Sequence, residues 1–344
     1  MKSVDMLKTV RVVQRELEKF EPFFRQQLQS SVPLLSTITN HIYRSKGKQL
    51  RPLLVFLSAK LSGGICQKTY AGAAMMELLH TATLMHDDVV DDADERRNSL
   101  SIKALWSSPK AVLAGDFLLS RGVLVALEHQ SVEFLNIAAN TIRCMSEGEL
   151  QQLERARKLE WSEEMYFDII QKKTASLLQS CALIGAHSAG ATGERLDAVG
   201  RYGELLGVAF QLRDDVLDFY SSRITGKACG NDIREKKITL PLIFALNRVD
   251  KAERKKILSL VSTASFNSRN VKQVVSFVRA QGGLEHTERV MLGYCNSAKR
   301  ALDIFPESDA KAALLNLADA IAEQDAKCTK CYPQPLEVRL CHEP

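Results

Sequence analysis

The spacing of its prolines constrains this chain of 344 residues more than any other feature. No proline occurs between Pro109 and Pro241, although this stretch contains the most apolar segments of the chain. Because proline breaks a helix interior, its absence permits long helices, and apolar residues here recur every three or four positions. The pairs Gly63-Gly64 and Gly282-Gly283 are typical breaks between helices. No segment alternates as a half-buried strand does, so the sequence predicts an all-α fold.

The composition indicates one large core. Hydrophobic residues make up 45% and charged residues 25% of the chain, a balance typical of globular proteins. No linker rich in glycine, serine or proline divides it, so we expect a single helical domain over residues 1–326 and an irregular tail over 327–344. The net charge of +5 comes from dispersed basic residues, which argues against a nucleic-acid partner.

Two further features bear on the compartment. The first 20 residues are amphipathic and lack the uninterrupted apolar run of a secretory signal. Residues 174–193 carry no charge, but their polar and small residues favour a buried core helix over a membrane span. With no signal peptide, the eight cysteines are expected to be free thiols. We therefore predict a cytoplasmic protein with no stable membrane span.

The tail poses a separate question. Cys328, Cys331, Cys341 and His342 could ligate zinc. The alternative, a disordered tail with exposed thiols, is favoured because no second tight pair of ligands faces the first.

Two copies of one acidic pattern point to chemistry. The first reads DDVVD and the second DDVLD, each after a strongly apolar helical run, and their aspartates are Asp87, Asp88, Asp91, Asp214, Asp215 and Asp218. On a helix, residues four apart share a face, with Cβ atoms roughly 5–6 Å apart. Each motif therefore pairs its first and last carboxylates. Like charges at that spacing repel unless a cation lies between them.

Magnesium suits this spacing. It prefers one or two carboxylates and completes its octahedron with water and phosphate oxygens. Two facing clusters would hold several ions and one diphosphate. The alternative, solvated acidic helix faces, explains a single motif better than it explains two that both follow apolar runs.

From about residue 46 to 241 the sequence resembles the trans-isoprenyl diphosphate synthases. The runs DDVVDDADERR and FQLRDDVLD are similar to that family's two aspartate-rich motifs. The segments GKQLRP, QKKTASL and TGKACGNDIREKKITLP resemble further family motifs, with Asp232 at a matching position. Asn231 departs from the pattern, since many members carry lysine or threonine there. The resemblance implies a single-domain orthogonal helical bundle of the isoprenoid synthase type with a central active-site cavity.

The resemblance also implies roles for individual residues. Mg²⁺, with three ions per site, would be held by Asp87, Asp91, Asp214 and Asp218. The catalytic set would be Asp87, Asp88, Asp91, Lys173, Asp214 and Asp215. Substrate diphosphates would be bound by Lys48, Arg51, His80, Arg96, Arg97, Lys173, Thr174, Gln211, Lys227 and Lys237. His80 lies two helical turns before Asp87, so it points to the same side.

The implied reaction is condensation of isopentenyl diphosphate with an allylic diphosphate, farnesyl or geranylgeranyl, by Mg²⁺-assisted ionisation. The length of the product should depend on residues upstream of Asp87. Short-chain members of the family carry an aromatic residue there, whereas this chain has small ones, so its pocket should be deep and lined by Ala82, Thr83, Leu79, Met76 and Met75. This favours a long-chain product, hexaprenyl or beyond. The alternative is geranylgeranyl diphosphate, if Leu118, Leu119 or Val125 closes the pocket.

Three other hypotheses compete with this one. A terpene cyclase would share the first motif but usually carries an asparagine, serine and glutamate triad in place of the second. A partner-dependent subunit of a heteromeric synthase typically has eroded motifs, and both are complete here. A helical scaffold with acidic patches does not explain the ordered basic residues. The family also implies a homodimer.

Overall fold

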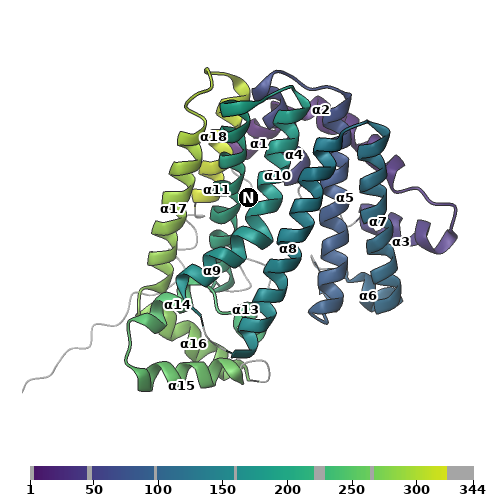
Figure 1. The fold of residues 1–344 in the computed structure, drawn as a ribbon. Helices are drawn as coiled ribbons and strands as arrows, with labels where there is room; N and C mark the ends of the chain where they lie inside the picture. Colours follow the sequence, from purple (N-terminus) through teal and green to yellow (C-terminus); the bar gives the residue numbers. More distant parts are fainter. Residues whose placement is uncertain are drawn as a thin grey trace, which may run out of the picture.

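Long helices dominate the computed structural model, which describes residues 4–44, 49–96, 99–158, 161–220, 229–263 and 267–323 (Figure 1). The amino-terminal half contains α1 (Val4–Arg11), α2 (Gln14–Gln27), α3 (Pro33–Arg44), α4 (Leu50–Ser62), α5 (Gln67–Val90), α6 (Ile102–Trp106), α7 (Ser108–Glu128) and α8 (Val132–Lys158). The rest contains α9 (Glu163–Ile170), the π-helical turn η1 (Gln171–Ala175), α10 (Ser176–Ser188), α11 (Gly193–Asp218), α13 (Asn231–Arg234), α14 (Leu240–Asn247), α15 (Lys251–Ser262), α16 (Ser268–Ala280), α17 (Gly283–Ala301) and α18 (Asp309–Ala322).

The helix α5 runs through the core. It packs against α4, α7 and α10, and also touches α2 and α8 (Figure 1). Every residue from Ala71 to Leu79 is buried, so this part of the helix has no face exposed to solvent. A helix that is apolar on every side can be stable only when it is surrounded in this way.

The helix α11 forms the second centre of the core, against α10 and α17. Tyr202 is fully buried there and donates a hydrogen bond from its hydroxyl to the Leu314 carbonyl of α18 at 2.7 Å. In Figure 1 both α5 and α11 run towards the end of the bundle where α13 lies. Each aspartate motif therefore arrives at the same end of the molecule.

The turn η1 is held tightly between α8 and α11. A Cβ atom on Gly207 of α11 would lie 2.5 Å from the Cα of Ala175, and one on Gly148 of α8 would lie 3.2 Å from the amide nitrogen of Lys173. Glycine at these two positions is what lets both helices approach the turn. Single π-helical turns often occur at functional sites, and this one carries Lys173 and Thr174.

The prediction of an all-α fold is confirmed, with one small addition. Strands β1 (Glu95–Arg96) and β2 (Ser99–Leu100) form a short antiparallel pair after the first aspartate motif. Within the described ranges no helix is both long and apolar enough to span a bilayer. The uncharged segment 174–193 supplies α10, which is largely buried. The cysteines in the described part are free thiols, whereas the predicted domain boundary at 326 and the tail lie outside the described residues.

Candidate active site

The first aspartate motif lies at the carboxyl end of α5. Asp87 and Asp88 belong to its last turn, and Asp91 follows the helix, with its amide donating to the Asp87 carbonyl at 2.8 Å. Asp87 and Asp91 are thus one turn apart, as their spacing predicts. Asp88 is only 3% exposed and lines a separate cavity that contains His80.

The second motif ends α11, and its three carboxylates have different surroundings. Asp214 is exposed, whereas Asp215 is 1% exposed. Asp218 accepts hydrogen bonds from two backbone amides, that of Asn231 at 3.0 Å and that of Asp232 at 3.1 Å. Both oxygens of Asp218 therefore hold the start of α13, and its role as a metal ligand stays a prediction.

Asp215 is the centre of a buried hydrogen-bond network. Its carboxylate accepts from the Tyr166 hydroxyl at 2.5 Å and from the Gln211 amide at 2.8 Å, and Thr174 donates to the Gln211 carbonyl oxygen at 2.7 Å. Burial raises the pKa of Asp215 to about 7; the two hydrogen bonds lower it, and the charges of the neighbouring aspartates raise it. The network fixes Thr174 and Gln211 beside the second motif.

Asp232 adds a second buried acid at this end of the bundle. Burial raises its pKa well above the ordinary range, and the charges of Asp218 and Asp215 raise it further. Such a concentration of acids is costly without cations.

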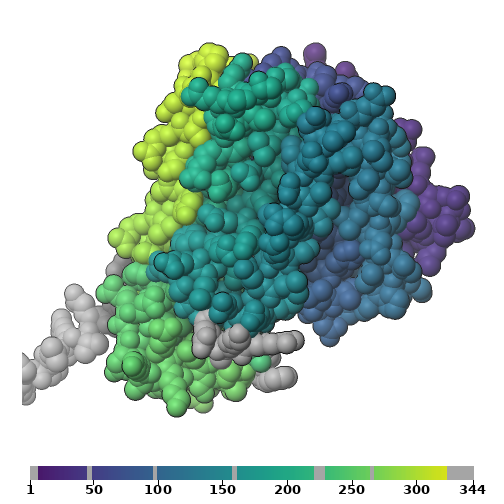
Figure 2. Space-filling view, viewed as in Figure 1, coloured from purple at the N-terminus to yellow at the C-terminus, as the bar shows by residue number. Residues whose placement is uncertain are grey.

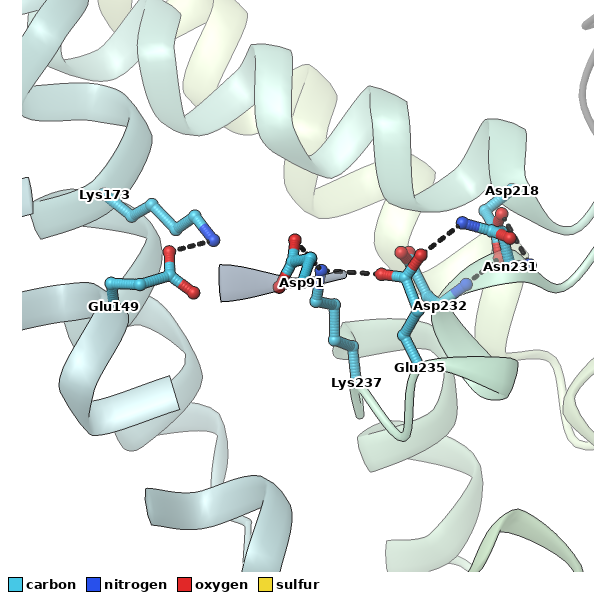
Figure 3. A network of polar contacts seen from close by, with 8 residues as sticks. All are labelled: Asp91, Glu149, Lys173, Asp218, Asn231, Asp232, Glu235 and Lys237. Carbon is cyan, nitrogen blue, oxygen red and sulfur yellow. Dashed lines mark hydrogen bonds and ion pairs between the residues drawn. The ribbon is translucent and has the colours of Figure 1, made fainter. Parts of the chain in front are cut away.

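The two lysines that face the motifs each pair with a glutamate. Lys173 forms an ion pair with Glu149 of α8 (Figure 3). Lys237 lies between Glu235, at 2.6 Å, and Asp91 of the first motif, at 3.4 Å (Figure 3). Lys237 therefore connects the segment after α11 with the carboxyl end of α5.

One cavity brings many of the predicted residues together. It has a volume of about 130 Å³ and opens to solvent. Its lining includes the predicted residues Lys173, Thr174, Gln211, Asp215 and Lys237, and also Asp232, Tyr166, Gln152, Trp161, Ile169, Ile170, Ile238 and Thr239. Cations and hydrogen-bond donors at one end and apolar side chains around them suit a ligand with an anionic head and an apolar body.

A second cavity lies on the other side of the first motif. His80, Glu77, Thr81 and Asp88 contribute to its wall. Arg51 lies in the first turn of α4, a helix that packs against α5. The predicted binding residues that line a cavity thus form two groups: the first cavity has Lys173, Thr174, Gln211 and Lys237, and the second has His80.

Four further predicted residues have side chains outside the described part of the structure. Lys48, Arg97 and Lys227 lie outside the described residues, as does the side chain of Arg96, whose backbone belongs to β1.

Comparison with known proteins decides the family. The sequence profile of the polyprenyl synthetases matches residues 32–278. The chain belongs to the polyprenyl synthetase family. It is therefore a prenyltransferase, and the resemblance seen in the sequence is confirmed.

Individual relatives of this polyprenyl synthetase differ in the products they are named for. It is 31% identical to the short chain isoprenyl diphosphate synthase of Methanothermobacter thermautotrophicus, over 93% of this chain and all of that one. It is 33% identical to the octaprenyl diphosphate synthase of Haemophilus influenzae, over 88% of this chain and 92% of that one. The crystal structure of a polyprenyl synthase from Caulobacter crescentus, complexed with calcium and isoprenyl diphosphate, superposes with a TM-score of 0.88 at 34% identity, covering 93% and 98% of the two chains.

The residues predicted to set product length in this prenyltransferase are closely packed. Ala82 and Met76 are fully buried, and Leu79 is 3% exposed. Thr83 is half-buried and donates a hydrogen bond to the His80 carbonyl at 2.9 Å. Neighbouring side chains therefore cover Ala82, Met76 and Leu79 in this structure.

Sequence reasoning missed three residues that contact the site of this synthetase: Tyr166, Glu149 and Glu235. Each comes from a different element and reaches the site only through packing. The Gly148 that lets α8 approach η1 was the one local signal for Glu149.

The acidic residues fit magnesium. Carboxylate oxygens are its preferred protein ligands, and it takes only one or two of them when phosphate is present. In the part of the chain that the structure describes, no three histidine, cysteine, aspartate or glutamate side chains converge closely enough to hold an ion by themselves. That Asp87, Asp91 and Asp214 hold such an ion stays a prediction.

Proposed function

We propose that this protein is an all-trans polyprenyl diphosphate synthase that lengthens farnesyl or geranylgeranyl diphosphate with isopentenyl diphosphate to hexaprenyl diphosphate or beyond. The observation that supports it most is the shared cavity, in which Lys173, Thr174, Gln211 and Lys237 meet beside both aspartate motifs.

In this proposal the cavity holds the allylic diphosphate. Lys173 and Lys237 supply compact positive charge to its phosphate oxygens, and Thr174 and Gln211 supply hydrogen bonds. Bound Mg²⁺, three ions in this proposal, supplies Lewis acidity that offsets charge on the departing diphosphate. Asp87, Asp91 and Asp214 hold these ions, and Asp215 keeps Gln211 in place.

Isopentenyl diphosphate takes the other side of α5. Arg51 and His80, with Lys48 and Arg97, hold its diphosphate and aim its double bond at the allylic carbon. Ionisation of the allylic diphosphate leaves a resonance-stabilised cation, the double bond attacks it, and loss of a proton completes a chain longer by one five-carbon unit. The departing diphosphate is the base in this scheme, so no nucleophilic side chain is needed.

The product grows along α5, away from the aspartates. Ala82 and Thr83 stand where an aromatic side chain would block its path, about 6–7.5 Å from Asp87 along the helix axis. Methionines continue the path at Met76 and Met75, and their flexible side chains can adapt to a growing chain. The closed packing around Ala82 favours the second candidate, a geranylgeranyl diphosphate synthase.

The proposal includes a homodimer. An apolar stripe, Leu113, Leu124 and Leu127 of α7 with Val132 of α8, is 47–68% exposed. Leu113 and Leu124 lie on one face, because 11 residues make about three turns. The stripe belongs to two helices on the face shown in Figure 2, where a second copy of the chain would cover it. The proposal also includes a cytoplasmic location, no nucleic-acid partner and no stable membrane span.

The test is a chain-elongation assay. Purified protein is incubated with labelled isopentenyl diphosphate, farnesyl or geranylgeranyl diphosphate, and Mg²⁺, and the products are sized by reversed-phase chromatography. A single long polyprenyl diphosphate that disappears with EDTA is the expected result. Geranylgeranyl diphosphate as the end point would favour the second candidate. Folded protein that elongates no primer would overturn the proposal in favour of a partner-dependent subunit.

A further inference from the structure

Lys237 joins the first aspartate motif to the segment that follows the second. Its ammonium lies 3.4 Å from Asp91 Oδ2 and 2.6 Å from Glu235 Oε2 (Figure 3). Its side chain is 22% exposed and that of Asp91 is 25% exposed, so the contact is partly shielded from solvent. An ammonium at this place already occupies a carboxylate that a metal ion would need.

Contacts within residues 231–237 hold the Lys237 side chain in its position. Asn231 donates a side-chain hydrogen bond to Glu235 Oε1 at 2.6 Å, which leaves Oε2 directed at Lys237. Lys236 has a φ of 59°, a left-handed conformation that side chains rarely adopt. The amide of Lys237 donates to the Asp232 carbonyl at 2.8 Å and closes the turn. Asn231, the departure from the family pattern, thus has a defined contact.

The charges around Lys237 keep it protonated. Burial alone would lower its pKa, but the carboxylates of Glu235, Asp91 and Asp232 raise it above the ordinary value. A lysine ammonium is charged at neutral pH in any case, and this one lies 3.4 Å from Asp91. A divalent cation on Asp91 would lie close to that charge and be repelled by it.

We propose that Lys237 is a built-in counter-ion for Asp91 in the ligand-free enzyme, aimed by Glu235 and Asn231, and that it leaves Asp91 for the diphosphate when metal and diphosphate enter together. A metal ion that binds Asp91 alone must displace the Lys237 ammonium, which then loses an anionic partner. When a diphosphate binds as well, it supplies a new anionic partner for that ammonium. Each ligand therefore strengthens binding of the other, since coupling between sites is reciprocal. The inference rests on the proposed function only in naming a diphosphate as the second ligand.

Lys173 provides a matched control. It lines the same cavity and carries the same charge, but its ion pair is with Glu149 and not with an aspartate of either motif. Loss of either lysine removes one positive charge from the lining of the cavity. Only the loss of Lys237 frees Asp91.

The test measures Mn²⁺ binding by electron paramagnetic resonance on the full chain without substrate. We expect Lys237→Met to bind Mn²⁺ at least about fivefold more tightly than wild type, while Lys173→Met changes less than about twofold. Inorganic diphosphate should then strengthen Mn²⁺ binding more in wild type than in Lys237→Met. Lys237→Arg, which keeps the charge, should retain the weak binding of wild type and covers the case in which Lys237→Met does not fold.

Equal tightening in Lys237→Met and Lys173→Met, or a Lys237→Arg protein that binds as tightly as Lys237→Met, would overturn the inference. The elongation assay on wild type is separate from these readouts. Wild type that elongates primers without the Mn²⁺ contrast would refute only the counter-ion. The contrast without elongation would refute only the proposed function.

Discussion

The Tyr166 hydroxyl donates a 2.5 Å hydrogen bond to the buried carboxylate of Asp215, and so ties α9 to the second aspartate motif. Tyr166 is itself 3% exposed, and burial followed by the charge of Asp215 raises its pKa well above the usual value. The proton of this bond therefore stays on the phenol, and the tyrosine serves as a fixed donor.

Tyr166→Phe should lower the free energy of unfolding by about 1–3 kcal/mol, because it leaves a buried carboxylate oxygen without its donor. Thermal and urea unfolding in EDTA measure this. Tyr294→Phe, which removes the hydroxyl of a half-buried tyrosine in α17, is the control and should cost less. Equal costs would show that the bond to Asp215 contributes nothing specific.

Asp215 should make stability depend on pH. Its ordinary pKa is 3.8, and burial, the first cause, raises it to about 7 in the folded protein. Between these values the unfolded chain has released the proton and the folded chain retains it. The free energy of unfolding should therefore fall as pH rises from about 4 to about 7. Urea unfolding in EDTA across this range should show the fall in wild type and a smaller one in Asp215→Asn; an unchanged slope in the variant would refute it.

Asp87→Ala and Asp214→Ala should each lower turnover by at least about a hundredfold while the fold is kept, because each removes a carboxylate expected to hold charge-neutralising metal. Asp92→Asn is the matched control. Asp92 lies next to the first motif, but its side chain is 90% exposed and pairs with Lys103. Elongation assays measure the turnover of each variant, and circular dichroism shows whether its fold is kept. Near-normal activity in either alanine variant would contradict the metal site.

Ala82→Phe should shorten the product without abolishing turnover, since an aromatic side chain would then close the path beside α5. Ala82 is fully buried, so the variant should also lose about 1–3 kcal/mol of stability from overpacking. Ala318→Phe in α18, at another fully buried alanine, controls for overpacking and should leave product length unchanged. Reversed-phase chromatography measures the length of the product in each variant. An unchanged product length in Ala82→Phe would show that Ala82 does not line the product pocket.

Leu124→Lys should weaken the proposed dimer, because it places a charge within the apolar stripe of α7. Leu292→Lys in α17 changes a leucine of similar exposure, 43% against 47%, outside that stripe. Sedimentation velocity at several concentrations should show more monomer for the first variant only. Two variants with the same profile as wild type would contradict the stripe as the interface.

The sequence alone was enough to predict that the chain is helical and that each aspartate motif follows a long apolar helical run. A run as apolar as that before Asp87 can be stable only inside the core, so its last turn must emerge with the aspartates. The roles of single carboxylates were harder to predict, because Asp88 and Asp215 differ from their neighbours only in burial. The neighbouring Gly148 was the one local signal for Glu149, whose partner Lys173 comes from another element. Glu235 lacked a distinctive signal, because its contacts with Asn231 and Lys237 depend on how the turn after α13 folds.

The π-helical turn η1 sets the rotational phase between α9 and α10. An α-helix turns by about 100° per residue, and a π turn accommodates one residue more than an α turn does. α9 must present Tyr166 to Asp215, while α10 must present Cys181 to the core. If residue 172 were deleted and the turn became α-helical, one of these two faces would be rotated away by about 100°. The extra residue of η1 therefore fixes the orientation of α9 relative to α10, and the position of Lys173 in the cavity wall depends on it.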